Sequence, residues 1–256
     1  MIVEPKREIL LGPLLRAGVR RSWAARDHFL RLSVAPLIVM VAILVPLQSA
    51  LEQMMFGSEV TELPQASGQT ALLLVAYVAV LTVFAVNWLR QLTLGMRAVP
   101  GLGLSLGGRN IRFFLVMLAT LFGSGALAVI LVFILGPFGL PGAGAAIMVS
   151  VLAWAVVLAR ISPSWIGIAI DAPMPLSVAW RRTAGQGFKL LLALLAIDVP
   201  LMFVRQLVGA LFVGTGLLDA APLTFTLITA ILQLVGTAAQ LAILATAFPY
   251  FLRETV

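Results

Sequence analysis

The chain has 256 residues, of which 61% are hydrophobic and only 11% are charged, and its mean hydropathy is +1.10. A soluble domain is about one quarter charged and no more than half apolar. This composition therefore excludes a soluble globular enzyme, a disordered protein and a nucleic-acid binder of the usual kind. The net charge of +7 is typical of a membrane protein that keeps Lys and Arg in its cytoplasmic loops.

The first 28 residues predict a cytoplasmic interfacial helix. Apolar side chains recur every four residues within 5–28 and make one stripe, formed by Leu11, Leu15, Val19 and Trp23. Beside this stripe lie Arg16, Arg20, Arg21 and Arg26. Such a helix can lie at headgroup level with its arginines on anionic lipid. The alternative is a charged lead-in that only sets the topology.

Six apolar runs follow, and each is about long enough to cross a bilayer, which takes roughly 20 residues. We expect an all-α, polytopic membrane bundle in which residues 29–256 form one domain. The predicted transmembrane helices cover about 29–51, 70–94, 112–135, 144–168, 189–214 and 222–249.

Basic and non-basic connections alternate along this series. Lys and Arg occur before the first span, between the second and third, between the fourth and fifth, and in the tail. The other connections, at about 52–69, 136–143 and 215–221, carry none. Because Lys and Arg stay in cytoplasmic loops, we expect both termini in the cytoplasm and a multi-pass protein of the cell inner membrane.

Glycine and other small residues mark two further features. Ala119, Gly123, Ser124 and Ala128 give the spacing that lets membrane helices approach closely. The run from Gly136 to Gly144 predicts a tight turn between the third and fourth spans.

The fifth span contains two ionisable residues, Asp198 and Arg205, at membrane depth. They lie seven residues apart, on one helix face and about 10 Å apart along its axis. The sixth span carries a polar stripe in which Gln240 should lie near the depth of Asp198, and Gln233 near that of Arg205. The functional interpretation is a substrate, ion or lipid-headgroup site. The structural one is a set of polar contacts that fix helix register.

The connector over 160–189 predicts a short helix at headgroup level, with Trp180, Arg181 and Arg182 on it. It is either a surface that docks lipid or a partner, or a connector that sets the topology.

Little in the chain predicts catalysis. Cysteine is absent and His28 is the single histidine, so we expect no metal and no cofactor. The motifs of hydrolases, metalloproteases, nucleotide-binding proteins and kinases are missing. We therefore expect that the protein is not an enzyme.

Three segments carry a family resemblance: AGVRRSWAARDHFLRLSVAPLI, ISPSWIGIAIDAPMPLSVAWRRTAGQGFKLLLALLAI and the closing AFPYFLRE. They are similar to a bacterial six-span membrane family, which includes stand-alone proteins and the membrane domain attached to some glycerophosphodiester phosphodiesterases. The chain departs from the family pattern at Ser162, where we expect an apolar residue before Pro163. The catalytic barrel of those enzymes is a separate soluble domain, so the resemblance implies no phosphodiesterase activity.

The leading functional hypothesis is a non-enzymatic accessory or scaffold protein with an envelope-lipid-related role. We expect anionic lipid headgroups as partners, together with a membrane-protein partner or a second copy of the chain, and no nucleic acid. The alternative is a transporter or permease subunit with a midplane site around Asp198 and Arg205.

Overall fold

The computed structural model describes residues 9–56, 68–95, 99, 107–135, 137 and 139–252. Its long helices are α2 (Arg26–Phe56), α3 (Gly68–Leu94), α4 (Gly108–Leu135), α5 (Gly139–Ala169), α7 (Gly187–Gly214) and α9 (Pro222–Leu252). Shorter helices are α1 (Leu11–Ala24), α6 (Leu176–Arg182) and α8 (Leu217–Ala220). The described chain is thus all-helical, as its composition predicts.

Six helices are long and apolar enough to cross a membrane, which confirms the predicted number of candidate spans. Each predicted range falls on one of these helices. Their apolar segments are Arg26–Leu47, Gly68–Leu94, Gly108–Leu135, Met148–Ala169, Gly187–Gly214 and Pro222–Leu252.

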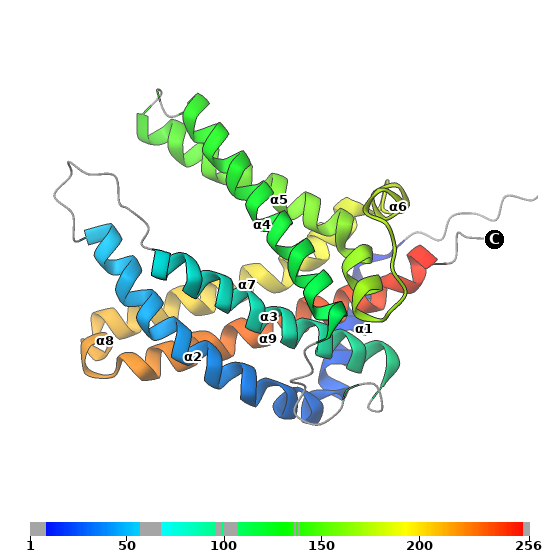
Figure 1. The fold of residues 1–256 in the computed structure, drawn as a ribbon, viewed down its shortest axis with the longest axis horizontal. Helices are drawn as coiled ribbons and strands as arrows, with labels where there is room; N and C mark the ends of the chain where they lie inside the picture. Colours follow the sequence, from blue (N-terminus) through cyan, green and yellow to red (C-terminus); the bar gives the residue numbers. More distant parts are fainter. Residues whose placement is uncertain are drawn as a thin grey trace, which may run out of the picture.

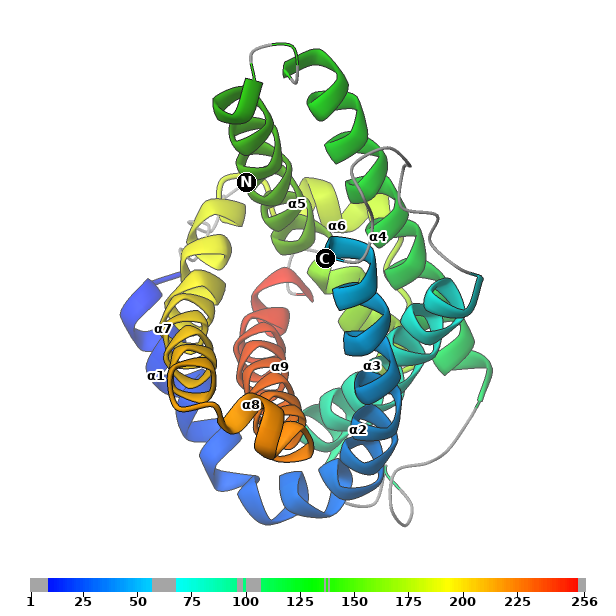
Figure 2. The ribbon, with the colours of Figure 1, turned by 90° about the vertical axis from the view of Figure 1, so that its left-hand side faces the viewer.

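Helix α9 is the centre of the bundle and contacts α1, α2, α3, α5 and α7. Figure 2 shows α9 between α7 on one side and α2 with α3 on the other. Its buried face is rich in alanine, including Ala230, Ala238, Ala242 and Ala245. Small side chains allow neighbouring backbones to approach, and the indole Nε1 of the buried Trp88 donates a 2.9 Å hydrogen bond to the Ala238 carbonyl.

The α4–α5 hairpin packs against the rest of the bundle only near one end and projects away from it at the other (Figure 1). The most apolar window of α4 contains no buried residue. Large side chains such as Phe122 and Phe133 are exposed there. Exposed apolar surface of this extent is expected of a helix that faces lipid or a protein partner in the membrane.

Two boundary predictions are wrong. A single helix over 5–28 is replaced by α1 and α2, which meet at a break at Ala25; residues 1–8 lie outside the described part. The predicted turn over Gly136–Gly144 is too long, because α5 already begins at Gly139. Pro141 suggested a turn, but proline is tolerated in the first turn of a helix, where its missing N–H would have no partner.

Candidate functional site at the basic end

One end of the bundle collects almost all of the positive charge. Helices α2, α4 and α7 begin at this end, whereas α3, α5 and α9 finish there, and α1 and α6 lie across it (Figure 1). Of the described Lys and Arg residues, only Arg205 lies away from it. Two described acids, Asp27 and Asp171, accompany these cations. We call this region the basic end.

Several arginines at the basic end donate to backbone carbonyls. Arg21 of α1 donates to the carbonyl of Leu92, among the last four residues of α3, whose carbonyls lack a donor within the helix. It also donates to the Ala245 carbonyl of α9 at 3.2 Å. Residue 249 is a proline and has no N–H, so this carbonyl has lost its usual partner four residues on. Burial lowers the pKa of the Arg21 guanidinium, which an arginine tolerates without losing its charge.

Arginines also donate hydrogen bonds to backbone carbonyls at the ends of α5 and α9. Arg182 of α6 donates to the carbonyl of Phe251, near the end of α9, at 2.8 Å. Arg90 of α3 donates to the carbonyl of Ala169, the last residue of α5, at 3.0 Å. A cation is favourable at a helix C-terminus because the partial charge there is negative. These arginines therefore tie α1, α3 and α6 to the ends of neighbouring helices.

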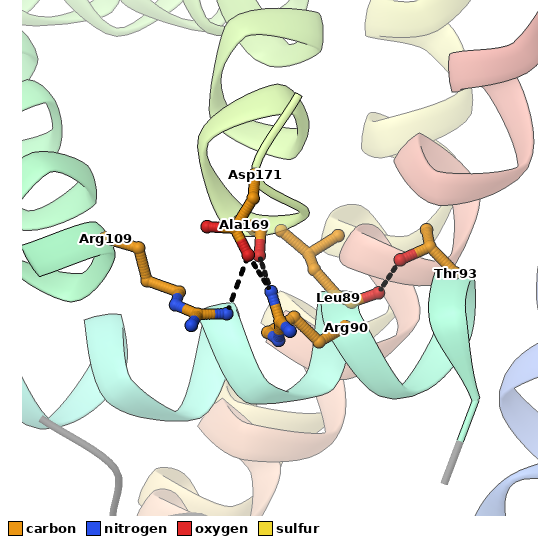
Figure 3. A network of polar contacts seen from close by, with 6 residues as sticks. All are labelled: Leu89, Arg90, Thr93, Arg109, Ala169 and Asp171. Atoms are coloured by element: carbon orange, nitrogen blue, oxygen red, sulfur yellow. Dashed lines mark hydrogen bonds and ion pairs between the residues drawn. The ribbon is translucent and has the colours of Figure 1, made fainter. Parts of the chain in front are cut away.

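A tight turn after α5 presents Asp171 to two of these arginines. The chain folds back on Gly167, where an added Cβ would lie 2.5 Å from the Ala172 carbonyl oxygen, so that only glycine fits. Asp171 then adopts the left-handed conformation, with φ of 60°. Its carboxylate accepts hydrogen bonds from Arg90 at 2.7 Å and from Arg109 of α4 at 3.0 Å (Figure 3).

Helix α1 divides its surface between the bundle and the outside. Leu14 and Gly18 are buried, and a Cβ on Gly18 would lie 2.8 Å from the Ile243 side chain of α9. Leu11 and Leu15 pack beside them. The outer side carries the exposed Arg16, Arg20 and Val19, together with Trp23, which is 70% exposed. Only part of the predicted apolar stripe therefore stays on the outer side.

Helix α6 is held to α5 and also exposes cationic and aromatic groups. The Arg160 guanidinium of α5 stacks over the Trp180 ring at 3.9 Å and donates to the Trp180 carbonyl at 2.8 Å. Arg181 is exposed. Among the residues predicted for a lipid or partner surface, Arg16, Arg20, Trp23, Trp180 and Arg181 thus face outwards, whereas Arg21 and Arg182 bind protein carbonyls.

The predicted intramembrane residues lie between α7 and α9. Asp198 lies within interaction range of the Gln240 side chain and of the charge on Arg205. Arg205 donates to the carbonyl of Leu232, one position from Gln233, at 3.5 Å. Gln233 and Gln240 are half-buried. The structure therefore brings Asp198 and Gln240 together, and places Arg205 against the backbone of α9.

Sequence reasoning did not select Arg90, Arg109 or Asp171 as site residues. Their meeting depends on how α3, α4 and the turn after α5 pack together. The one available signal was a single acid, Asp171, in an otherwise basic connector. Within the described residues, no cluster of three or more His, Cys, Asp or Glu could hold a metal ion.

Comparison with known proteins gives no match: no family model, no curated protein and no solved structure is similar to this chain. The function has to be argued from the geometry alone.

Proposed function

We propose that this chain is a non-enzymatic accessory or scaffold protein of the bacterial inner membrane, and that its basic end binds anionic phospholipid headgroups on the cytoplasmic side. Membership of the six-span family that it resembles is part of this proposal, on the three segments quoted above.

The segregation of charge carries the proposal. Cations gather where α1 and α6 cross the bundle end, while the six long helices between the two ends are predominantly apolar. Arg16, Arg20 and Arg181 are exposed there, next to exposed indole rings. Tryptophan is enriched at the membrane interface. Each Lys or Arg near an anionic surface contributes about 1 kcal/mol of attraction.

Retention of lipid by the purified protein tests this role. The full chain, released from mixed vesicles into mild detergent, should retain phosphatidylglycerol in preference to phosphatidylcholine in native mass spectrometry. The triple variant Arg16→Gln/Arg20→Gln/Arg181→Gln should lose this preference. The matched control with lysine at the same three positions keeps the charge and should keep the preference. Equal retention of both lipids by the unmodified chain would overturn the proposal.

The orientation has its own test. The chain has no cysteine, so single cysteines can be placed at Ala184, exposed at the basic end, and at Ala220, exposed in α8 at the opposite end. In intact cells, a membrane-impermeant maleimide should label the cysteine at 220 and spare the one at 184. The reverse pattern would place the basic end outside the cytoplasm.

The contact between Asp198 and Gln240 supports a second candidate, a transporter or permease subunit. A transport site needs access for water, whereas a register-fixing contact does not. A cysteine at Asp198 should react with a small cationic thiol reagent if a water-filled path reaches it. Phe203→Cys, on an exposed face of the same helix, is the matched control for lipid exposure. Equal, slow reaction at both positions would leave the scaffold role as the better account.

A further inference from the structure

A cavity of about 410 Å³ lies at the basic end, between the start of α4 and the turn after α5. Gly108, Arg109 and Arg112 line it from α4, and Ile168, Asp171 and Pro173 line it from the other side. The start of α4 and the turn after α5 thus enclose a cavity that has both cationic and apolar walls.

The charges around this cavity favour an anion. The carboxylate of Asp171 is compensated by Arg90 at 2.7 Å and by Arg109 at 3.0 Å. Three guanidinium groups, counting Arg112, against one carboxylate leave an excess of two positive charges. In the described part of the chain, no hydrogen bond or ion pair holds the Arg112 guanidinium. It is therefore free to bind a ligand in the cavity.

The geometry also provides room and orientation. The ion pair with Asp171 orients Arg109 in the cavity lining, so part of the ordering of its long side chain has already been achieved before a ligand binds. A Cβ on Gly108 would meet nothing within 4 Å, so the lining is open at this point. Guanidinium groups bind phosphate oxygens with paired hydrogen bonds, which makes arginine the preferred residue for this ligand.

We propose that this cavity binds a phosphate group, with Arg109 and Arg112 as its ligands. The group belongs to an anionic phospholipid headgroup or to a soluble phosphate compound, and the apolar walls at Ile168 and Pro173 suit the carbon atoms next to it. The inference rests on the proposed lipid-facing role of the basic end for its lipid source.

A single cysteine at Gly108 reports occupancy of the cavity, because the chain has no other thiol. Ala184→Cys is the matched control at the same end of the bundle, outside the lining. In neutral detergent, dihexanoyl-phosphatidylglycerol at four times its Kd should slow N-ethylmaleimide labelling at 108 by about fivefold and leave the rate at 184 unchanged. Dihexanoyl-phosphatidylcholine should protect neither position.

Inorganic phosphate and glycerol phosphate separate the two sources. Protection by the short-chain lipid alone assigns the site to a headgroup, whereas equal protection by the soluble compounds assigns it to a soluble phosphate. Protection by none of these probes would overturn the proposal. Arg112→Gln should raise the Kd of the protecting ligand about tenfold, so that the fivefold slowing almost disappears, since a charge-assisted contact is lost. Arg26→Gln removes the same charge from an exposed position at the same end, outside the cavity, and should not.

The same Arg112→Gln and Arg26→Gln substitutions in the cysteine-free chain, followed by native mass spectrometry of phosphatidylglycerol retention, guard against disturbance by the cysteine itself. Loss of one tightly retained lipid in Arg112→Gln alone supports a lipid in the cavity. Retention that falls only in the triple variant at Arg16, Arg20 and Arg181 refutes the cavity and leaves the proposed function standing. If protection at Gly108→Cys persists in the triple variant while the lipid preference is lost, the two sites are independent.

Discussion

Arg21 offers the sharpest test of how the basic end holds the bundle together. Its guanidinium donates to two carbonyls without helical partners, those of Leu92 and Ala245. A hydrogen bond from a charged group contributes about 1.5–3 kcal/mol, and partial access of water lowers this for a half-buried site. We therefore expect Arg21→Met to lower the free energy of unfolding by about 2–3 kcal/mol.

Part of this loss should vanish when Pro249 is replaced by alanine. The new N–H at 249 can then donate to the Ala245 carbonyl. Only the Leu92 carbonyl then still needs a hydrogen bond from Arg21. In the Pro249→Ala background, Arg21→Met should cost about 1 kcal/mol less than in the unmodified chain.

Thermal unfolding in mild detergent, with a denaturant titration for the free energies, measures all four proteins of this cycle. Arg20→Met is the matched control, because Arg20 is exposed on the same helix and carries the same charge. It should change the stability by no more than about 0.5 kcal/mol. An Arg21→Met loss equal to that of Arg20→Met, or one that is identical in both backgrounds, would refute the capping role.

Three further substitutions test local features by the same unfolding measurement. Ser162→Ala should lower the free energy of unfolding by about 1 kcal/mol, because the Ser162 hydroxyl donates to the Ala159 carbonyl, to which Pro163 has no N–H to donate. Ser177→Ala, at an exposed position, should lower it less, and equal losses would contradict the argument. Gly167→Ala should lower the free energy of unfolding by about 1–3 kcal/mol, because the new Cβ clashes with the Ala172 carbonyl. Its control, Gly125→Ala, lies in open space and should raise that free energy by up to about 1 kcal/mol. An unchanged stability of Gly167→Ala would show that the turn can shift to accept the methyl group. Trp88→Phe should lower the free energy of unfolding by about 2 kcal/mol, because packing and the hydrogen bond to the Ala238 carbonyl are lost. Trp23→Phe, at an exposed position, should leave the stability nearly unchanged, and equal losses in the two variants would show that Trp88 does not stabilise the core.

The six apolar helices could be predicted because a lipid bilayer imposes one requirement on every segment that crosses it. Backbone groups have to be bonded within the segment, and about 20 apolar side chains have to cover it. Both conditions are local, so composition and length suffice to find the helices. The end of each helix depends on weaker preferences, which is why the predicted turn near Gly139 was too long.

The packed face of α1 could not be predicted, because it depends on a residue more than 200 positions away. The apolar stripe through Val19 and Trp23 was the strongest local pattern, but Gly18 is the residue that lets α1 approach Ile243 of α9. A small residue on a polar stretch gives no hydrophobic signal. Its importance is visible only once the partner is in place.

The candidate intramembrane contact was easier to predict than the cavity at the basic end. Asp198 and Gln240 belong to consecutive long helices, so counting residues from their common turn gives their depth, and the structure brings them together. The lining of the cavity comes from the start of α4 and from a turn that needs Gly167 and a left-handed Asp171. A sequence shows neither the turn conformation nor the pairing of arginines with one carboxylate.

Prolines inside the spans show where local reasoning is sufficient and where it fails. Each one frees a carbonyl four residues earlier, and in lipid that carbonyl needs a donor. At Pro163 the donor is the preceding residue, Ser162, whose hydroxyl donates to the Ala159 carbonyl. At Pro249 the donor is Arg21, from the far end of the chain. Charge counting assigned Arg21 to the same class as its neighbours Arg16 and Arg20. Its bonds to the carbonyls of Ala245 and Leu92 distinguish Arg21, which holds the bundle, from the exposed Arg16 and Arg20.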